Sequence, residues 1–406
     1  MDEERIHTLA EIIKEYRNDE LNCRLDEWHV KNWLNQFDED YREVILNETV
    51  HVLQEWFFGQ EKLDKFLDAV LAYLCKQQLI SELELLKKAV FLKTQGQMNS
   101  QTRIVERLRE IVWERYGEEI LTSDEIQDGI YVYLDDGLYT GAKARRDIAS
   151  VISQLPEGAA LYVVFLVAAV QNFNYSKKCL DAIARERAIH FQMLRMYSLA
   201  NSRWVNTGID ENGNEVRSYS PIHACLWPTE TVKDIPVVKE YIDSYIEPYD
   251  KKEKKLFRIE PWKNDKGIFT SLENRNIVEK EFLFKGIELA KHSRDNGLYA
   301  LGFNSWPSLG FGSFCATYMN TSNTCPLVLW WGNIEKKRDI LDSWYPLLPR
   351  RIGEIEHIET FEEPIEELDI SYDKHDQYNL CPDCGRQFGI MEDGGNGFCI
   401  KCAWKH

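Results

Sequence analysis

The stretch Gly129–Gly141, GIYVYLDDGLYTG, runs from an alternating apolar segment into two adjacent carboxylates and then a Thr-Gly pair. Its first part, Ile130–Leu134, is rich in β-branched and aromatic residues, and it predicts a buried or half-buried strand. Asp135 and Asp136 then stand where open α/β sheets bind their ligands, just beyond the carboxyl end of a strand. This order of residues predicts a ligand site at the edge of a sheet.

A turn and a helix follow the two carboxylates. Gly137 and Gly141 permit backbone conformations that other residues resist, and Thr140 adds a hydroxyl. A helix over Ala142–Gln154 would begin directly after this turn, so its free N–H groups would be ready to bind a phosphate. Three cations crowd the first helical turns: Lys143, Arg145 and Arg146. The helix dipole disfavours positive charge there, and a bound anion would remove the conflict.

The segments after this turn alternate between strand and helix patterns. We expect strands over Leu161–Val170 and His190–Tyr197, with a helix over Ser176–Arg187 between them. The alternation of strands and helices implies an α/β fold with a parallel sheet of the doubly wound type. Two later apolar segments, Phe314–Met319 and Leu327–Trp331, are expected to extend this sheet.

The first 127 residues carry apolar residues at helical spacing almost throughout and predict a helical domain. The clearest examples are Glu27–Gln36, Tyr41–Phe57, Leu63–Leu79 and Arg103–Tyr116. Their aromatic side chains form either a surface for docking a partner or the core of a helix bundle. Because aromatic stripes at helical spacing usually face inward, the core is favoured.

Composition narrows the class of protein. The chain has 406 residues, of which 44% are hydrophobic, which is enough for a large core and, by length, two or three domains. A formal net charge of −18 argues against a broad nucleic-acid-binding surface, although it leaves room for a local basic patch. No apolar run is long enough to span a membrane. The N-terminus is acidic and amphipathic, unlike a secretory or transit peptide, so we expect a cytoplasmic protein.

Four of the ten cysteines are clustered near the C-terminus as two Cys-x-x-Cys pairs, Cys381/Cys384 and Cys399/Cys402. This spacing predicts four thiolates around one tetrahedral, structural Zn²⁺. Zinc-coupled folding would replace a core that so short a segment cannot build. The alternatives are four unrelated thiols or a redox pair. Either nucleic acid or protein could contact such a zinc ribbon, and protein is favoured.

The strongly acidic segment Gly353–Asp376 predicts a linker with some order rather than a catalytic carboxylate site. We therefore expect four parts in the chain. They are a helical domain over residues 1–127, an α/β domain over 128–352, an acidic linker over 353–378 and a zinc ribbon over 379–406.

The opening stretch resembles the phosphoribosyl-pyrophosphate motif of type I phosphoribosyltransferases, in which an apolar strand leads into two acidic residues, three variable residues and a Thr-Gly. The resemblance implies that Asp135 and Asp136 are catalytic and hold the ribose hydroxyls, with Mg²⁺ near Asp136. It also implies that the turn wraps the 5′-phosphate through Gly137, Leu138, Tyr139, Thr140 and Gly141. Cleavage at C1 of a ribosyl donor passes through an oxocarbenium-like state, which nearby carboxylates stabilise. The alternative is a plain strand-turn-helix with surface aspartates.

The chain departs from active members of that family in two respects. Such enzymes have earlier strands and a pyrophosphate-binding loop ahead of the motif, where residues 1–127 predict helices. Lys143 also stands where a hydroxyl residue is frequent, although it stays a candidate ligand contact. These departures favour binding of a ribose phosphate over transfer from phosphoribosyl pyrophosphate.

The same departures resemble a narrower group, the phosphoribosyltransferase-like proteins of bacterial conflict systems, some of which are found beside retron reverse transcriptases. Three short elements carry this resemblance: WL-x-QF at Trp33–Phe37, N-T-x-N-T-x-P at Asn320–Pro326 and W-x-P-L-x-P-R at Trp344–Arg350. The resemblance implies an antiviral effector that acts on nucleotides or nucleic acid by N-glycosidic or phosphoribosyl chemistry. It also implies a partner that holds the effector inactive, a reverse transcriptase with its RNA–DNA hybrid.

Alternatives remain at the level of residues and of function. Asn320, Asn323 and Thr324 are candidate contacts for a ribose or a base edge, or else they cap their own backbone as turn residues. The chain could be a non-catalytic module that senses a nucleotide or builds an assembly, or a salvage-type phosphoribosyltransferase. The sequence leaves the substrate base and the oligomeric state open.

Overall fold

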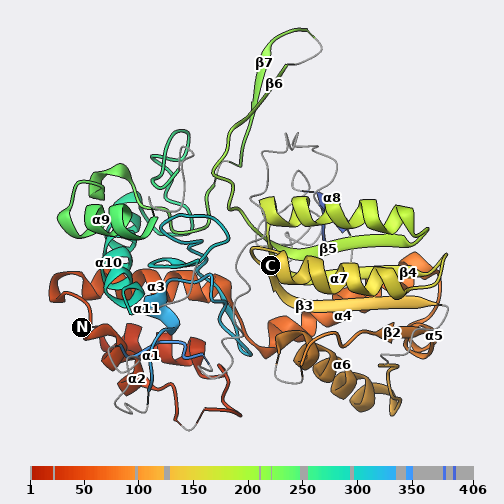
Figure 1. Cartoon of the computed structure of the whole chain (residues 1–406). Coiled ribbons are helices and arrows are strands. Elements are labelled where there is room, and N and C mark those ends of the chain that lie inside the picture. The colour runs from red at the N-terminus through yellow and green to blue at the C-terminus, as the bar shows by residue number, and fades with distance from the viewer. Residues whose placement is uncertain are drawn as a thin grey trace. The chain divides into compact units, whose positions relative to one another are not determined.

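The computed structural model describes residues 2–21, 23–96, 99–122, 129–209, 212–220, 222–246, 255–292, 297–334, 344–350, 378–380 and 387–389. The chain forms two compact units, and each is built from two separate segments (Figure 1). Unit 1 comprises Met1–Gly59 and Ala200–Asp369, and unit 2 comprises Gln60–Leu199 and Ile370–His406. The boundary expected at residue 127 falls inside unit 2, and the helices of residues 1–127 are shared between the two units.

Unit 2 is built on a sheet of six strands in the order β12-β11-β5-β4-β3-β2. The strands are β2 (Ala89–Phe91), β3 (Ile130–Leu138), β4 (Ala160–Ala169), β5 (His190–Leu199), β11 (Tyr378–Leu380) and β12 (Gln387–Gly389). All neighbours pair in parallel except β11 and β12, which are antiparallel. The expected α/β class with a parallel sheet is therefore confirmed.

Helices cover both faces of this sheet. They are α4 (Gln60–Gln78), α5 (Glu82–Lys88), α6 (Ser100–Tyr116), α7 (Ala142–Gln154) and α8 (Val170–Glu186). Helices α7 and α8 lie on one face of the sheet (Figure 1). There their apolar side chains pack with Tyr131, Val163 and Met193. On the opposite face, Tyr73 Oη of α4 donates a hydrogen bond to Gln192 Oε1 over 2.5 Å. Alternation along the strands thus gives each face its own helices.

Most elements around the Gly129–Gly141 stretch, which carries Asp135 and Asp136, follow the prediction, and two differ. Helix α7 has the expected bounds, and β4, α8 and β5 follow in the expected order. Strand β3, however, does not end at Leu134 but continues through both aspartates to Leu138. The expectation of helices alone ahead of the motif is wrong, because β2 pairs in parallel with β3. Its three buried residues are too few to show a strand period.

Unit 1 is mainly helical. Its helices are α1 (Glu3–Ile13), α2 (Glu27–Leu34), α3 (Arg42–Trp56), α9 (Pro236–Tyr241), α10 (Leu272–Ala290) and α11 (Leu327–Trp330), with 3₁₀ turns η1 (Glu39–Tyr41) and η2 (Glu230–Val232) and the π-turn η3 (Ile242–Ile246). Its short strands form three pairs: β1 (Phe57–Phe58) with β10 (Ala316–Thr317), β6 (Asn206–Ile209) with β7 (Glu215–Ser218), and β8 (Leu298–Tyr299) with β9 (Gly302–Phe303). Among the residues described here, no helix is both long and apolar enough to cross a membrane.

The expectation that two late apolar segments extend the sheet is wrong. Within Phe314–Met319 only Ala316–Thr317 is a strand, and it pairs with β1 in unit 1. Leu327–Trp330 is the short helix α11, and all four of its residues are buried. A short apolar run that is buried on every side has no period that separates strand from helix.

The aromatic residues near the N-terminus form core, as favoured from their spacing. Trp33 is fully buried, and the Phe37 ring lies 5.3 Å from Trp344 and 5.7 Å from Phe282, between ring centroids. Trp28 differs, since 67% of it is exposed. The elements around Trp33 and Trp344, which carried the resemblance in the sequence, thus pack against each other in unit 1.

A buried histidine beside this core makes the stability of unit 1 depend on pH. His29 Nε2 donates to Leu347 O over 2.8 Å, and Nδ1 accepts from Tyr345 Oη over 2.9 Å. Burial lowers the pKa of His29 to about 4. Because an unfolded histidine titrates near 6.5, the stabilisation is complete above that pH and is lost as the pH falls from 6.5 towards 4.

We therefore expect the free energy of unfolding to fall by about 2 kcal/mol from this residue alone between about pH 7.5 and about pH 5. Chemical denaturation at both pH values measures it. The variant His29→Gln should be less stable than the wild type at the higher pH. Its free energy of unfolding should decrease by about 2 kcal/mol less than that of the wild type between the two pH values. His7→Gln is the control, because the bond to Glu27 raises the pKa of His7. If the free energy of unfolding of His29→Gln decreases as much as that of the wild type, His29 is not the source of the pH dependence.

Candidate functional site

Asp135, at the carboxyl end of β3, is a buried carboxylate with three hydrogen-bond donors. Its Oδ1 accepts from Asp136 N over 2.9 Å and from Ser100 Oγ over 3.3 Å, and its Oδ2 accepts from Tyr133 Oη over 3.1 Å. Only 7% of the residue is exposed. Burial, and after it the charge of Asp136, raises the pKa of Asp135 well above its usual value. Its oxygens are thus directed largely at the protein.

The network around Asp135 extends into the loop that follows β2. Gln95, in that loop, donates from Nε2 to Tyr133 Oη over 3.2 Å and to Asp147 Oδ2 over 3.0 Å. Burial raises the pKa of Tyr133, so its hydroxyl stays protonated and donates to Asp135. Strand β3, the β2 loop, α6 and α7 are therefore joined through one network of buried and half-buried polar groups.

Asp136 is placed differently from its neighbour. It is half-buried, and its main-chain N–H is one of the donors to Asp135. Its carboxylate is close enough to that of Asp135 to raise the pKa of Asp135, both by its charge and through a side-chain hydrogen bond. The two aspartates, which the sequence treats as a matched pair, thus have different environments.

The turn from Gly137 to Gly141 is held against α8. Asn172 Nδ2 donates to Thr140 O over 3.2 Å. Gly141 has φ +80°, and a Cβ at this position would lie 2.7 Å from Ser176 Oγ and 3.0 Å from Arg145 Nη1. The left-handed backbone and the close approach of Ser176 both require glycine here.

The rest of the turn and the three cations of α7 have distinct surroundings. A Cβ on Gly137 would lie 2.6 Å from the Tyr139 ring. Leu138 is buried, whereas Tyr139, Thr140 and Lys143 are half-buried and Arg146 is exposed. Arg145 clamps α7 to α8, since Nη1 donates to Ser176 Oγ over 3.1 Å and its guanidinium lies 4.9 Å from the Tyr175 ring centroid.

A further cation at this edge was missed in the sequence. Asp135, Phe165 and Arg195 are register partners on β3, β4 and β5, so they share one face and one level of the sheet. Arg195 is fully buried, donates from Nε to Ser198 Oγ over 2.8 Å and lies 4.2 Å from the Phe173 ring centroid. An arginine in the middle of an apolar strand was the signal that could have found it.

The other predicted ligand contacts lie in unit 1, whereas the acidic stretch lies in unit 2. Thr324 is buried, and its hydroxyl forms hydrogen bonds to Ser313 Oγ over 2.8 Å and to Ser322 Oγ over 2.7 Å. Asn323 O accepts from Phe303 N, and Asn320 O accepts from Thr317 N. The Thr324 hydroxyl is thus held by two serines, whereas these bonds of Asn320 and Asn323 involve main-chain oxygens, so a ligand contact by any of the three side chains stays a prediction.

The four cysteines predicted to bind zinc, Cys381, Cys384, Cys399 and Cys402, lie outside the described residues. In the part of the chain that the structure describes, no group of three or more His, Cys, Asp or Glu is placed to hold a metal. The six other cysteines are free of disulfides: Cys23, Cys75, Cys179, Cys225, Cys315 and Cys325.

A parallel sheet in which strand β3 carries two aspartates near its carboxyl end and leads into a glycine turn, with a helix starting on that turn, is the arrangement of a phosphoribosyltransferase-like protein. A family model described as PRTase-CE matches residues 30–350, so the chain belongs to the PRTase-CE family. The match includes the Gly129–Gly141 stretch of unit 2 and the elements around Trp33 and Trp344 of unit 1. No curated protein and no solved structure matches the chain.

The backbone of the turn offers a direct test. Gly141→Ala should lower the free energy of unfolding by about 2 kcal/mol or more, because the new Cβ meets Ser176 in addition to the left-handed strain. Gly158→Ala is the matched control: Gly158 has φ +83° with nothing within 4 Å, so only the strain of about 1 kcal/mol applies. Equal losses in the two variants would show that α8 does not hold the turn.

Proposed function

We propose that the carboxyl edge of unit 2 binds a ligand containing ribose 5-phosphate. The observation that supports this most is the start of α7 on the left-handed Gly141, one short turn beyond the strand that carries Asp135 and Asp136. Such a start presents main-chain N–H groups to a phosphate. The carboxylate of Asp136 lies within the same short stretch and would accept hydrogen bonds from the ribose hydroxyls. Lys143 adds a positive charge on the first turn of α7.

In this proposal the two aspartates have different roles. Asp136 contacts the ribose and is the residue that would hold Mg²⁺ near the leaving group, where the ion would neutralise departing negative charge. Asp135 positions the start of α6 through Ser100 and, through Tyr133 and its bond from Gln95, the β2 loop. A buried carboxylate with three donors is costly to rearrange, so the edge is preorganised before a ligand binds.

Strand β2 bears on whether the site is catalytic. The lack of an upstream strand and loop was the main argument for a non-catalytic sensor. The loop after β2 supplies a second segment next to the acidic stretch, since Gln95 contacts Tyr133. This arrangement favours phosphoribosyl or N-glycosidic chemistry, in which Asp136 would stabilise an oxocarbenium-like state, over a sensor.

The biological role in the proposal rests on the resemblance to conflict-system proteins within the PRTase-CE family. The chain would be an antiviral effector in the cytoplasm, toxic when active and held inactive by a retron reverse transcriptase with its RNA–DNA hybrid. A C-terminal zinc ribbon would provide a contact for such a partner.

Binding of ribose 5-phosphate, measured by calorimetry on the full chain, tests the division between the aspartates. Asp136→Asn should weaken binding at least about tenfold and leave stability within about 0.5 kcal/mol of the wild type. Asp135→Asn should also weaken binding, but it should cost about 1–3 kcal/mol of stability, because a donor replaces an acceptor in a buried network.

The control for this pair is Asp181→Asn on α8, whose partner is Lys177 at 2.8 Å. This variant should bind ribose 5-phosphate like the wild type. Unchanged affinity in Asp136→Asn would refute the proposed ribose contact.

A cellular experiment separates effector from sensor. Expression of the chain alone should arrest growth and change the nucleotide pool seen by mass spectrometry, and the double variant Asp135→Asn/Asp136→Asn should do neither. Coexpression of the reverse transcriptase and its RNA–DNA hybrid should restore growth. Toxicity that persists in the double variant would refute the effector proposal. A nucleotide pool that stays unchanged during growth arrest would favour the sensor.

A further inference from the structure

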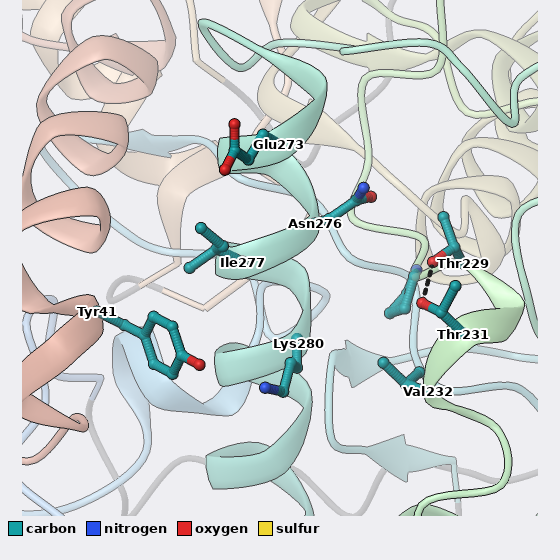
Figure 2. Close-up of a pocket in the computed structure, with 9 residues that line it drawn as sticks. Tyr41, Thr229, Thr231, Val232, Glu273, Asn276, Ile277 and Lys280 are labelled. Carbon is teal, nitrogen blue, oxygen red and sulfur yellow. Dashed lines mark hydrogen bonds between the residues drawn. The ribbon is translucent and has the colours of Figure 1, made fainter.

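A groove in unit 1 follows one face of α10 (Figure 2). Its volume is about 250 Å³. Helix α10 supplies four lining residues at spacings of three and four, which place them on one face: Glu273, Asn276, Ile277 and Lys280. In Figure 2, Tyr41 of η1 stands on one side of the helix, and Thr229, Thr231 and Val232 stand on the other.

One buried arginine joins α10 to the segment that begins at Pro228, on one side of this groove. Arg258 is 1% exposed, and its main-chain N donates to Pro228 O over 2.8 Å. Its Nη2 donates to Asn276 Oδ1 over 2.6 Å. Because a guanidinium only donates, this bond fixes the amide with Oδ1 towards Arg258 and leaves Nδ2 as a donor for the groove. The groove is thus a built feature rather than a chance gap between side chains.

The groove has a charge of opposite sign near each end. Glu273 and Lys280 are seven residues apart on α10, a rise of about 10 Å. The Lys280 ammonium lies 5.2 Å from the Tyr41 ring centroid and 5.5 Å from that of Phe284. Within the described part of the chain, neither Glu273 nor Lys280 forms an ion pair. Both charges are therefore available to a ligand.

The lining between these charges combines polar and apolar groups. Thr229 Oγ1 and Thr231 Oγ1 share a hydrogen bond of 2.7 Å, so one of the two hydroxyls can still donate. Ile277 and Val232 provide aliphatic surface. The volume lies below the roughly 300–1,000 Å³ of pockets for drug-sized molecules, so the groove suits something smaller than a nucleotide.

We propose that this groove binds a short peptide with free termini, extended along α10. Three extended residues span about 10 Å, which matches the separation of the two charges. The terminal ammonium would pair with Glu273 and the terminal carboxylate with Lys280. A peptide carbonyl would accept from Asn276 Nδ2, and small side chains would lie against Ile277 and Val232.

Binding of trialanine to the full-length protein, followed by calorimetry, tests the proposal. Wild-type protein should bind it with a Kd of about 1 mM or tighter. Glu273→Gln and Lys280→Gln should each weaken binding at least about tenfold. The matched controls Lys285→Gln and Glu288→Gln remove charges on α10 outside the groove and should leave the affinity unchanged.

Blocked peptides show which charge pairs with which terminus. C-terminally amidated trialanine should bind the wild type at least about tenfold more weakly, with no further loss in Lys280→Gln. N-acetylated trialanine should show the same relation to Glu273→Gln. Absence of trialanine binding, equal binding of a doubly blocked peptide, or displacement of trialanine by ribose 5-phosphate would each overturn the proposal. Because the groove lies in unit 1 and the ribose 5-phosphate site in unit 2, either site can fail without the other.

Discussion

The arrangement of unit 2 depends on the need to satisfy a carboxylate that the fold has taken out of water. Burying an unpaired charge costs free energy, and for a carboxylate this cost is smallest when several hydrogen-bond donors converge on it. Asp135 obtains its donors from the start of α6, from the strand residue two before it and from the next main-chain N–H. These hydrogen bonds fix the positions of the β2 loop, the start of α6 and the end of β3 relative to one another, at the edge of the sheet where we propose the ligand site.

Unit 1 follows the same logic with hydrogen bonds to backbone carbonyls. The indoles of Trp33 and Trp344 both donate to Val328 O, over 2.8 and 2.9 Å, so two distant segments meet on one carbonyl of α11. The side chain of Gln36 pairs with Tyr345 twice, as donor to its O and as acceptor from its N. The short elements around Trp33 and Trp344, which look like family motifs in the sequence, are thus packing contacts in the structure.

The sequence predicts those elements whose hydrophobic period or turn residues lie within the element itself. The order from β3 to β5 was found because each element has a clear period, and α7 was placed at its bounds because a glycine turn precedes it. The role of Asp135 was not accessible, since Ser100 and Gln95 are far away in the sequence and only packing brings them close. The continuation of β3 through two aspartates and the burial of Arg195 also oppose local preference, and only the tertiary context explains them. Short segments such as β2 and α11 lack the length that a period needs.

The segment order of the two units has a consequence for synthesis on the ribosome. Residues 60–199, which carry strands β2 to β5, form an insertion in unit 1, and the helices before them have their partners far downstream. Val328 follows Trp33 by 295 residues. At translation rates of roughly 5–20 residues per second, α2 is made some 15–60 s before its partner. The nascent N-terminal helices therefore leave the ribosome with an uncovered apolar face, whereas strands β2 to β5 are made together with the helices that cover them, and only β11 and β12 of their sheet follow later. Chaperone demand during translation should therefore fall mainly on the first 59 residues.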